Sequence, residues 1–388
     1  MKKLISLLFA FSYLFLLCHD ASATLEQRDT AWKAGVARIN ITPDESMWMA
    51  GYAFRDHASE GKLTDLWAKA LVLEDASGKR AVLVSTDLVG IRKALSERIR
   101  DRLQKQFGLT KAQIILNSSH THTGPETQSG PHIFSLEQKE LQKIDRYAKK
   151  LEDLLVNLVG EALKSLQPVK LYSENGVSRF QVNRRNNNEK TLASQTELKG
   201  PNDYAVPVIK VTDPQGKIIA VAFGYACHNT VLDGYDWSGD YAGYAQMELE
   251  KQYPGATALF FQGAGADQNP LPRRSVALAE QYGKTLAFAV DRVLNEKMRP
   301  LSSKLNVAYS EIDLKFQKPS PTAAELKTIM GDSSDYPAYL KQNAKVLLSK
   351  LEKGETLMTS YPYPVQVWKL GDQPLIALGG EVVVGYTN

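Results

Sequence analysis

Two histidines follow a short apolar run that begins at Ile114. Residues 114–125 read Ile-Ile-Leu-Asn-Ser-Ser-His-Thr-His-Thr-Gly-Pro. One residue separates His120 from His122, so on a strand both imidazoles would point the same way. The chain has only two cysteines, and a catalytic metal would therefore be held by imidazole and carboxylate groups. The pattern predicts a metal-dependent hydrolase with its site at the end of this strand.

A second apolar run, 218–225, leads into Ala-Cys-His-Asn-Thr and places His228 in a similar position. Two imidazoles and one carboxylate form a recurrent catalytic zinc set that leaves one position open for water. Glu381 is the favoured carboxylate, because it follows an apolar run and two glycines that let the backbone approach closely. We therefore predict a metal site made of His120, His228 and Glu381, with His122 facing the metal or the substrate.

Other polar residues in these loops have alternative interpretations. Cys227 adjoins His228 and could be a ligand or a nucleophile, although a small buried apolar residue is the favoured interpretation. Asp240 could either cap the helix that follows it or act in catalysis. Arg184 and Arg185 lie in a polar loop, where both would be solvated unless the substrate is anionic.

The elements that position these residues alternate between strands and helices. Residues 81–87 read as a buried strand, 93–107 as an amphipathic helix and 113–117 as the next strand, which is a βαβ pattern. Such strands run nearly parallel, and the residues past their carboxyl ends share one rim of the sheet. We therefore expect Asp87 and His120 to be neighbours on that rim.

The rest of the chain continues this alternation. It predicts an α/β fold of mixed β-sheets with flanking helices, and an active site at the carboxyl ends of the strands. The further predicted elements are a long helix over 136–166, strands around 169–172, 206–211, 218–225, 257–261 and 374–378, a loop over 183–202, a helix start at 238–244 and a surface helical hairpin over 323–353.

The N-terminal segment is typical of a secretory signal, with Lys2-Lys3, an apolar stretch over 4–17 and Ala-Ser-Ala at 21–23. Cleavage after Ala23 would leave about 365 residues in a secreted or periplasmic protein. No Pro-rich or Ser-rich linker divides 24–388, which we interpret as one catalytic domain. The apolar stretch is shorter than the ~20 residues that span a bilayer, so no transmembrane span is predicted.

Charge excludes one class of partner. The formal net charge is +4, from 47 basic and 43 acidic residues spread along the chain, and no basic block or basic-aromatic stripe indicates nucleic-acid binding. His57 and His132 lie in loops without an identifiable partner, and we expect both at the surface.

Seven stretches carry a resemblance to a known family: 35–43, 49–52, 120–125, 183–184, 228–230, 238–244 and 380–381. In this order they resemble the neutral/alkaline ceramidase family across nearly the whole mature chain. That family is secreted or membrane-associated, and it hydrolyses the amide of N-acylsphingosine with a zinc ion. The resemblance implies that His120, His228 and Glu381 are zinc ligands. It also implies that His122 is an active-site partner near the substrate and that Arg184 is the family's active-site arginine.

The chain departs from the family pattern in three ways. Aligning Asp267 places Asn269 where the family has a serine in a Gly-Asp-Val-Ser-Pro-Asn loop. A tyrosine ligand that normally follows the glutamate, and a C-terminal immunoglobulin-like domain, have no counterpart before Asn388. We therefore expect the sequence to be part of a longer protein. Asn269 could still donate a hydrogen bond to an oxyanion.

Together these features predict an exported zinc-dependent amidohydrolase. The zinc would lower the pKa of bound water toward ~7 and polarise the scissile carbonyl. His122 would serve as acid/base or oxyanion partner, and Arg184 would orient a lipid-like or other small N-acyl substrate. Two alternatives stay open: an esterase or amidase with a substrate other than ceramide, and a non-catalytic exported binding protein. The missing serine, tyrosine and C-terminal domain favour the binding protein.

Overall fold

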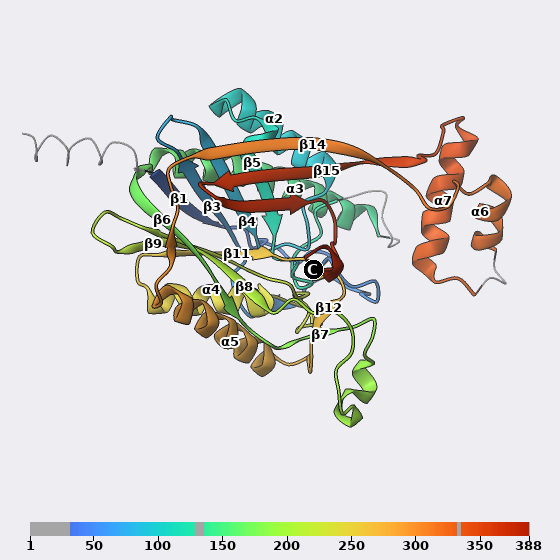
Figure 1. Ribbon diagram of the computed structural model, residues 1–388. Helices are drawn as coiled ribbons and strands as arrows, with labels where there is room; N and C mark the ends of the chain where they lie inside the picture. Colours follow the sequence, from blue (N-terminus) through green and yellow to red (C-terminus); the bar gives the residue numbers. More distant parts are fainter. Residues whose placement is uncertain (1–31, 129–135, 332–334, 388) are drawn as a thin grey trace, which may run out of the picture.

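The computed structural model describes residues 32–128, 136–331 and 335–387 (Figure 1). The predicted signal segment 1–23 and His132 lie outside the described residues. The strands of the main sheet are β1 (Trp32–Asn40), β3 (Trp67–Glu74), β4 (Arg80–Thr86), β5 (Ile114–Ser118), β6 (Gln167–Val177), β8 (Ala205–Thr212), β9 (Ile218–Tyr225), β11 (Thr257–Gln262) and β13 (Arg299–Pro300).

The helices and the smaller sheets complete the fold. The α-helices are α2 (Lys93–Phe107), α3 (Gln138–Lys164), α4 (Asp240–Gln252), α5 (Val276–Leu294), α6 (Ala323–Met330) and α7 (Ala338–Glu352). Short strands pair β2 (Gly61–Lys62) with β10 (Asp236–Trp237) and β7 (Gln181–Asn183) with β12 (Gln268–Pro270). A three-stranded sheet contains β14 (Leu305–Lys315), β15 (Ser360–Leu370) and β16 (Gln373–Leu378). The 3-10 turns are η1 (Lys111–Gln113), η2 (Glu189–Ser194) and η3 (Val384–Tyr386).

The main sheet is mixed and has the order β11-β9-β8-β6-β1-β3-β4-β5, with β13 beside β6. The pairs β4–β5 and β9–β11 are parallel, and the other neighbours are antiparallel. The two ends of this order meet, because Ser85 Oγ and Asn117 Nδ2 both donate to the carbonyl of Phe260. The ends of β5, β9 and β11 consequently deliver their loops to one region.

Three apolar clusters hold the layers together. Strand β3 shows why: Leu71 and Leu73 belong to the cluster between the two halves of the sheet, while Ala70 and Val72 belong to a cluster under α2 and α3. Side chains alternate between the faces of a strand, so a strand with both faces buried reads as an almost continuous apolar run. The third cluster packs α4 and α5 against β8, β9 and β11. Figure 1 shows α2 and α3 on one side of the sheets, and α4 and α5 on the other.

The predicted α/β class with mixed sheets and flanking helices is confirmed. The helix expected over 136–166 is α3, and the hairpin expected over 323–353 is α6 and α7, which project from the body in Figure 1. The loop expected over 183–202 contains η2. None of the helices within the described ranges is long and apolar enough to cross a membrane.

Candidate metal centre

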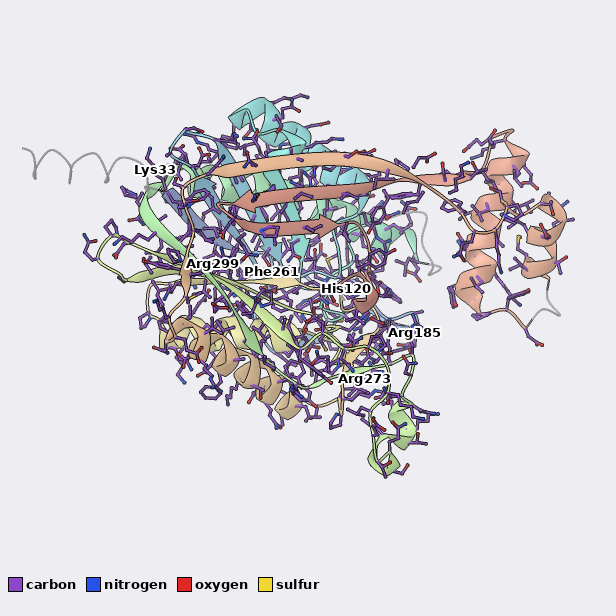
Figure 2. All side chains as sticks on the ribbon, viewed as in Figure 1. Lys33, His120, Arg185, Phe261, Arg273 and Arg299 are labelled. Carbon is purple, nitrogen blue, oxygen red and sulfur yellow. The ribbon has the colours of Figure 1, made fainter. Side chains whose placement is uncertain are left out.

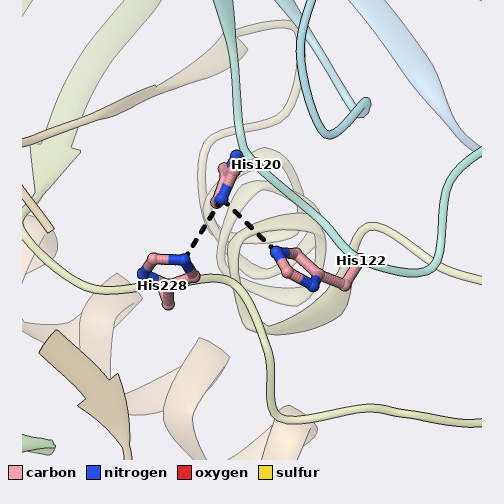
Figure 3. Close-up of side chains that lie close together, drawn as sticks. All are labelled: His120, His122 and His228. Atoms are coloured by element: carbon pink, nitrogen blue, oxygen red, sulfur yellow. Dashed lines mark hydrogen bonds between the residues drawn. The ribbon is translucent and has the colours of Figure 1, made fainter. Parts of the chain in front are cut away.

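Three histidine side chains converge beyond the ends of β5 and β9 (Figure 3). The Nε2 atom of His120 lies 3.2 Å from Nε2 of His228 and 3.3 Å from Nε2 of His122. One nitrogen from each ring lies within 4.8 Å of the others. Tetrahedral ligands at ~2.0–2.1 Å from a zinc ion are themselves about 3.3–3.4 Å apart. The spacing and the donor type therefore fit a metal of this kind.

Backbone carbonyls orient two of the three rings. His120 Nδ1 lies 2.7 Å from the carbonyl oxygen of Val89, and His228 Nδ1 lies 2.8 Å from that of Gly265. A carbonyl only accepts, so each Nδ1 carries the proton and each Nε2 presents its lone pair to the centre. His122 differs, because its buried Nδ1 has no hydrogen-bond partner among the described residues.

A carboxylate completes the group. Glu381 Oε2 lies 3.3 Å from His228 Nε2 and 3.7 Å from His120 Nε2. The contact with His228 is the main cause that lowers the pKa of Glu381 to about 2, so this carboxyl is ionised at neutral pH. The structure thus brings the three predicted metal ligands together, and it places His122 beside them.

Burial favours the neutral form of the His120 and His122 imidazoles. It lowers the pKa of His120, and the nearby His228 lowers it further. Burial also lowers the pKa of His122 well below its ordinary value, followed by the effects of His120 and His228. Neutral imidazole is the form that binds metals or accepts a proton, so the site is prepared for both at neutral pH.

Contacts between loops position the two histidines that follow β5. His120 follows the end of the strand with a φ of 64°, and its amide donates to the carbonyl of Leu88. Thr121 Oγ1 donates to the carbonyl of Ser238 at 2.8 Å, and Thr121 also forms a bridge with Asn229, next to His228. These contacts link the His120 loop directly to the His228 loop.

Gly51 places the His122 ring. Its φ is 97°, and a Cβ atom on this residue would lie 2.5 Å from Cγ of His122. The adjacent Ala50 amide donates to the carbonyl of Gly124, which holds this loop against the one that carries His122. Tyr52 packs its ring edge-on against His122, with 4.7 Å between the centroids. The stretch 49–52 is one of those that carry the family resemblance, but the sequence alone predicts no role for its residues.

Arg184 and Asn269 come from the small β7–β12 sheet. Asn269 pairs with Val182 in that sheet, and Arg184 Nη2 donates to the carbonyl of Ala266 at 2.6 Å. The segment after β16 joins the same region, because the Ala266 amide donates to the carbonyl of Val382. Arg184 and Asn269 also line one cavity together. The fold therefore brings both residues to the Glu381 segment.

Asp87 and Asp240 are fully buried but do not face the histidines. Asp87 Oδ2 accepts from the backbone amide of Trp67 at 2.9 Å, and Oδ1 accepts from Gln246. The backbone that follows Asp87, and not its carboxylate, contacts His120. Asp240 accepts from the amides of Leu232 and Tyr241, which supports a structural role at the start of α4.

The other predicted residues lie apart from the ligand atoms. Cys227 is buried, and burial raises the pKa of its thiol well above the usual range. His57 is exposed, stacks on Tyr235 and contacts Asp56. Arg185 is exposed.

Known proteins resemble this chain over the segment that carries the three histidines. The sequence profile described as neutral/alkaline non-lysosomal ceramidase, N-terminal, matches residues 32–270, which is more than half of the chain. Neutral ceramidase B of Dictyostelium discoideum is 28% identical over 268 residues, which cover 63% of this chain and 36% of that protein. Neutral ceramidase of Pseudomonas aeruginosa is 26% identical over 280 residues, covering 67% of this chain and 40% of that protein. The chain thus spans about two fifths of these relatives.

Solved structures have the same fold. The crystal structure of neutral ceramidase from Pseudomonas aeruginosa superposes with a TM-score of 0.68 at 20% identity, covering 92% of this chain and 63% of that one. A ceramidase complexed with C2 gives a TM-score of 0.67 at 18% identity. With the match over 32–270, these findings show that the chain belongs to the neutral/alkaline non-lysosomal ceramidase family.

Proposed function

We propose that this chain carries the catalytic site of a zinc-dependent hydrolase that cleaves the amide bond of an N-acyl substrate of the ceramide type. One observation carries the proposal. Two imidazoles are oriented by the carbonyls of Val89 and Gly265 and present Nε2 to a common centre, beside the ionised carboxylate of Glu381. Carbonyl-anchored imidazoles with a nearby carboxylate are the ligand arrangement that zinc hydrolases use.

Orientation of the rings supports different roles for the three histidines. His120, His228 and Glu381 would hold the zinc, which supplies an activated water and polarises the acyl carbonyl. His122 has no Nδ1 anchor, and its Nε2 lies 3.3 Å from that of His120. A neutral imidazole in this place can take up a proton from the attacking water and return it to the leaving amine.

Two further residues would contact the substrate. Arg184 would orient it, and Asn269 would donate a hydrogen bond to the developing oxyanion in place of the family's serine. A non-catalytic binding function is the second candidate. Asn269 favours it, because the amide of asparagine cannot act as a nucleophile as the hydroxyl of the family's serine can.

The test is the metal content of the purified protein by plasma mass spectrometry, followed by fatty-acid release from a panel of N-acyl lipids with and without chelator. We expect about one zinc per chain and chelator-sensitive release. His120→Ala and His228→Ala should lose the zinc, while His57→Ala, which removes an exposed histidine, should retain it. Full zinc occupancy in both ligand variants would refute the metal site. Zinc without release would favour the binding function.

We also propose that the protein is exported with cleavage after Ala23, because residues 1–23 have the composition of a secretory signal. N-terminal sequencing of the protein recovered outside the cytoplasm would give Thr24 as the first residue. A mature chain that still begins at Met1 would contradict this proposal.

A further inference from the structure

Arg55 is a buried cation beside the loops that carry the histidines. The residue is 3% exposed, and no carboxylate of the described residues lies within ion-pair distance of its guanidinium. The nearby Asp233 acts on it electrostatically but pairs with Arg274 at 3.3 Å. Arginine keeps its charge at neutral pH, and a buried charge without an ionic partner is costly. Features that oppose stability in this way are typical of functional sites.

Two backbone carbonyls accept hydrogen bonds from the guanidinium. Nη2 donates to the carbonyl of His122 at 2.8 Å, and Nη1 donates to that of Gly234 at 3.1 Å. The guanidinium is planar and holds its donors at fixed positions relative to one another. Arg55 therefore fixes the main chain at His122 relative to the loop that precedes β10.

Two tyrosine rings flank the guanidinium. Cζ of Arg55 lies 5.4 Å from the ring centroid of Tyr52 and 4.9 Å from that of Tyr235. A cation within about 6 Å of a ring centroid is attracted to the face of the ring. Tyr52 also packs edge-on against the His122 ring, so one tyrosine contacts both the cation and the imidazole. Arg55, Tyr52 and His122 thus form one packed group.

His122 is held through its main chain. Its amide donates to the carbonyl of Asn229 at 3.3 Å, and its carbonyl accepts from Arg55. By contrast, the rings of His120 and His228 are anchored directly, through Nδ1. The Nδ1 of His122 has no such partner in the part of the chain that the structure describes. The direction of this imidazole therefore depends on packing and on how its backbone is held.

We propose, on the basis of the role of His122 in the proposed function, that Arg55 is a positioning residue for this acid–base group. Arg55 fixes the backbone from which the imidazole projects. No backbone hydrogen bond then has to fix the tautomer of the ring, which stays suited to gain and lose a proton. A shift of about 1 Å in a reacting group can reduce the rate about 100-fold. Lysine would be a poor substitute, because its ammonium lacks the planar fork that reaches two carbonyls.

The main test is Arg55→Gln, assayed with the N-acyl lipid that the natural protein hydrolyses fastest. We expect kcat to fall by about 10- to 100-fold, with KM unchanged and the zinc retained. KM should not change, because Arg55 contacts the backbone of His122 and not the substrate. A natural kcat in the folded, zinc-containing variant would overturn the inference. Loss of zinc would also overturn it, because Arg55 would then support the metal ligands.

Chemical rescue separates positioning from a general loss of structure. Arg55→Ala removes the side chain whose guanidinium lies between the rings of Tyr52 and Tyr235, and a free guanidinium ion has the same shape and charge. Guanidinium chloride at millimolar concentrations should raise the kcat of Arg55→Ala, whereas sodium chloride at the same ionic strength should not. A loss of activity that guanidinium does not reverse would contradict the inference.

Tyr235 offers a variant that leaves Arg55 in place. Tyr235→Leu removes one of the two rings that flank the guanidinium, and it should lower kcat by about 2- to 5-fold, as expected for a single cation–π contact. Tyr235→Phe retains the ring and loses only the hydroxyl, which contacts Asp56, so its effect on kcat should be smaller. Equal effects of the two variants would contradict the inferred arrangement.

Two other arginines serve as controls. Arg100 donates through Nη1 to two backbone carbonyls, in η1 and at the start of β5. It thus makes the same kind of contact as Arg55, but at the opposite end of this strand from His120. Arg299 is exposed and lies well apart from His120 in Figure 2. Arg100→Gln and Arg299→Gln should both keep the natural kcat, and a fall as large as that of Arg55→Gln would overturn the specific role of Arg55.

Magnetic resonance separates this inference from the proposed function, because it needs no turnover. In the protein as purified, the imidazole nitrogen signals of His122, assigned with His122→Gln, should shift in Arg55→Gln by more than those of the anchored His228. Unchanged His122 signals would refute the positioning role and leave the proposed hydrolase intact. Shifted His122 signals in a protein that hydrolyses no N-acyl lipid would support the positioning role and refute the hydrolase.

Discussion

At the scale of single residues, the hydrogen bond on Nδ1 distinguishes the three imidazoles. His120 and His228 each donate to a backbone carbonyl, while the Nδ1 of His122 has no partner within the described ranges. A ring with a fixed tautomer is suited to bind a metal, and a ring free to gain and lose a proton is suited to acid–base work. This difference is the basis of the roles that we propose.

His122→Gln should therefore retain the metal but lose turnover. We expect zinc near one per chain and a kcat lowered by about 10²- to 10⁴-fold, the usual contribution of a general acid–base group. Zinc analysis and kinetics on the same preparation test this. If zinc is lost as completely as in His120→Ala, His122 is itself a ligand.

Gly51→Ala should impair His122 without unfolding the protein. The new Cβ would collide with the imidazole at 2.5 Å, so kcat should fall by at least about 10-fold, as expected for a misplaced catalytic group. Gly78→Ala is the control, because Gly78 has a similar φ of 84° and nothing within 4 Å of its added Cβ. Equal activities of the two variants would show that His122 does not depend on Gly51.

At the scale of elements, Asp87 joins the end of β4 to β3 and α4. Its carboxylate accepts from the backbone of Trp67 and from Gln246, and burial raises its pKa to about 6. The folded protein thus holds this proton more tightly than the unfolded chain, in which the pKa is about 3.9. The stability contributed by protonated Asp87 is fully present below about pH 4 and is lost as the pH rises through 6.

Asp87→Asn should flatten this pH dependence. The free energy of unfolding of the variant, minus that of the natural protein, should be more positive at pH 7.5 than at pH 4.5 by about 1–3 kcal/mol. Urea denaturation at both pH values measures it. Asp44→Asn, at an exposed carboxyl paired with Lys150, should show no such difference. A pH-independent effect of Asp87→Asn would contradict the raised pKa.

At the scale of the whole molecule, the α6–α7 hairpin is a separate packing unit. Its small core consists of Leu326, Ala344, Leu348 and four partly buried neighbours, all from these two helices. The chain leaves and re-enters the three-stranded sheet at a paired position, where the Phe316 amide donates to the carbonyl of Thr359. Figure 1 shows the hairpin standing away from the layers that hold the histidines.

Replacing residues 321–357 by a short Gly-Ser turn should therefore leave the site intact. We expect unchanged zinc content and an unfolding midpoint within a few degrees of the natural protein, as measured by thermal denaturation. Loss of zinc or of cooperative unfolding would show that the hairpin supports the main sheets.

The sequence by itself determined the residue types of the site and much of the framework. The apolar runs before His120 and His228 predicted β5 and β9, because a buried strand is recognised from a short run of adjacent apolar residues. The order of short motifs predicted the family, because each motif is also a local stretch of sequence. Strand β3 was missed. Its Lys69 interrupts the apolar pattern, and this buried charge is paired at 2.7 Å with Glu250, which lies 181 residues away in the sequence.

Tertiary structure alone decided how the site is assembled. His120 and His228 are 108 residues apart in sequence, yet their Nε2 atoms lie 3.2 Å apart. Asp87 was expected beside His120 on the rim. The backbone after Asp87 does contact His120, but the Asp87 carboxylate turns toward the amide of Trp67. Carbonyl anchors such as Val89 and Gly265 have no sequence signature, because every residue carries the same carbonyl and only the fold decides which one meets an imidazole.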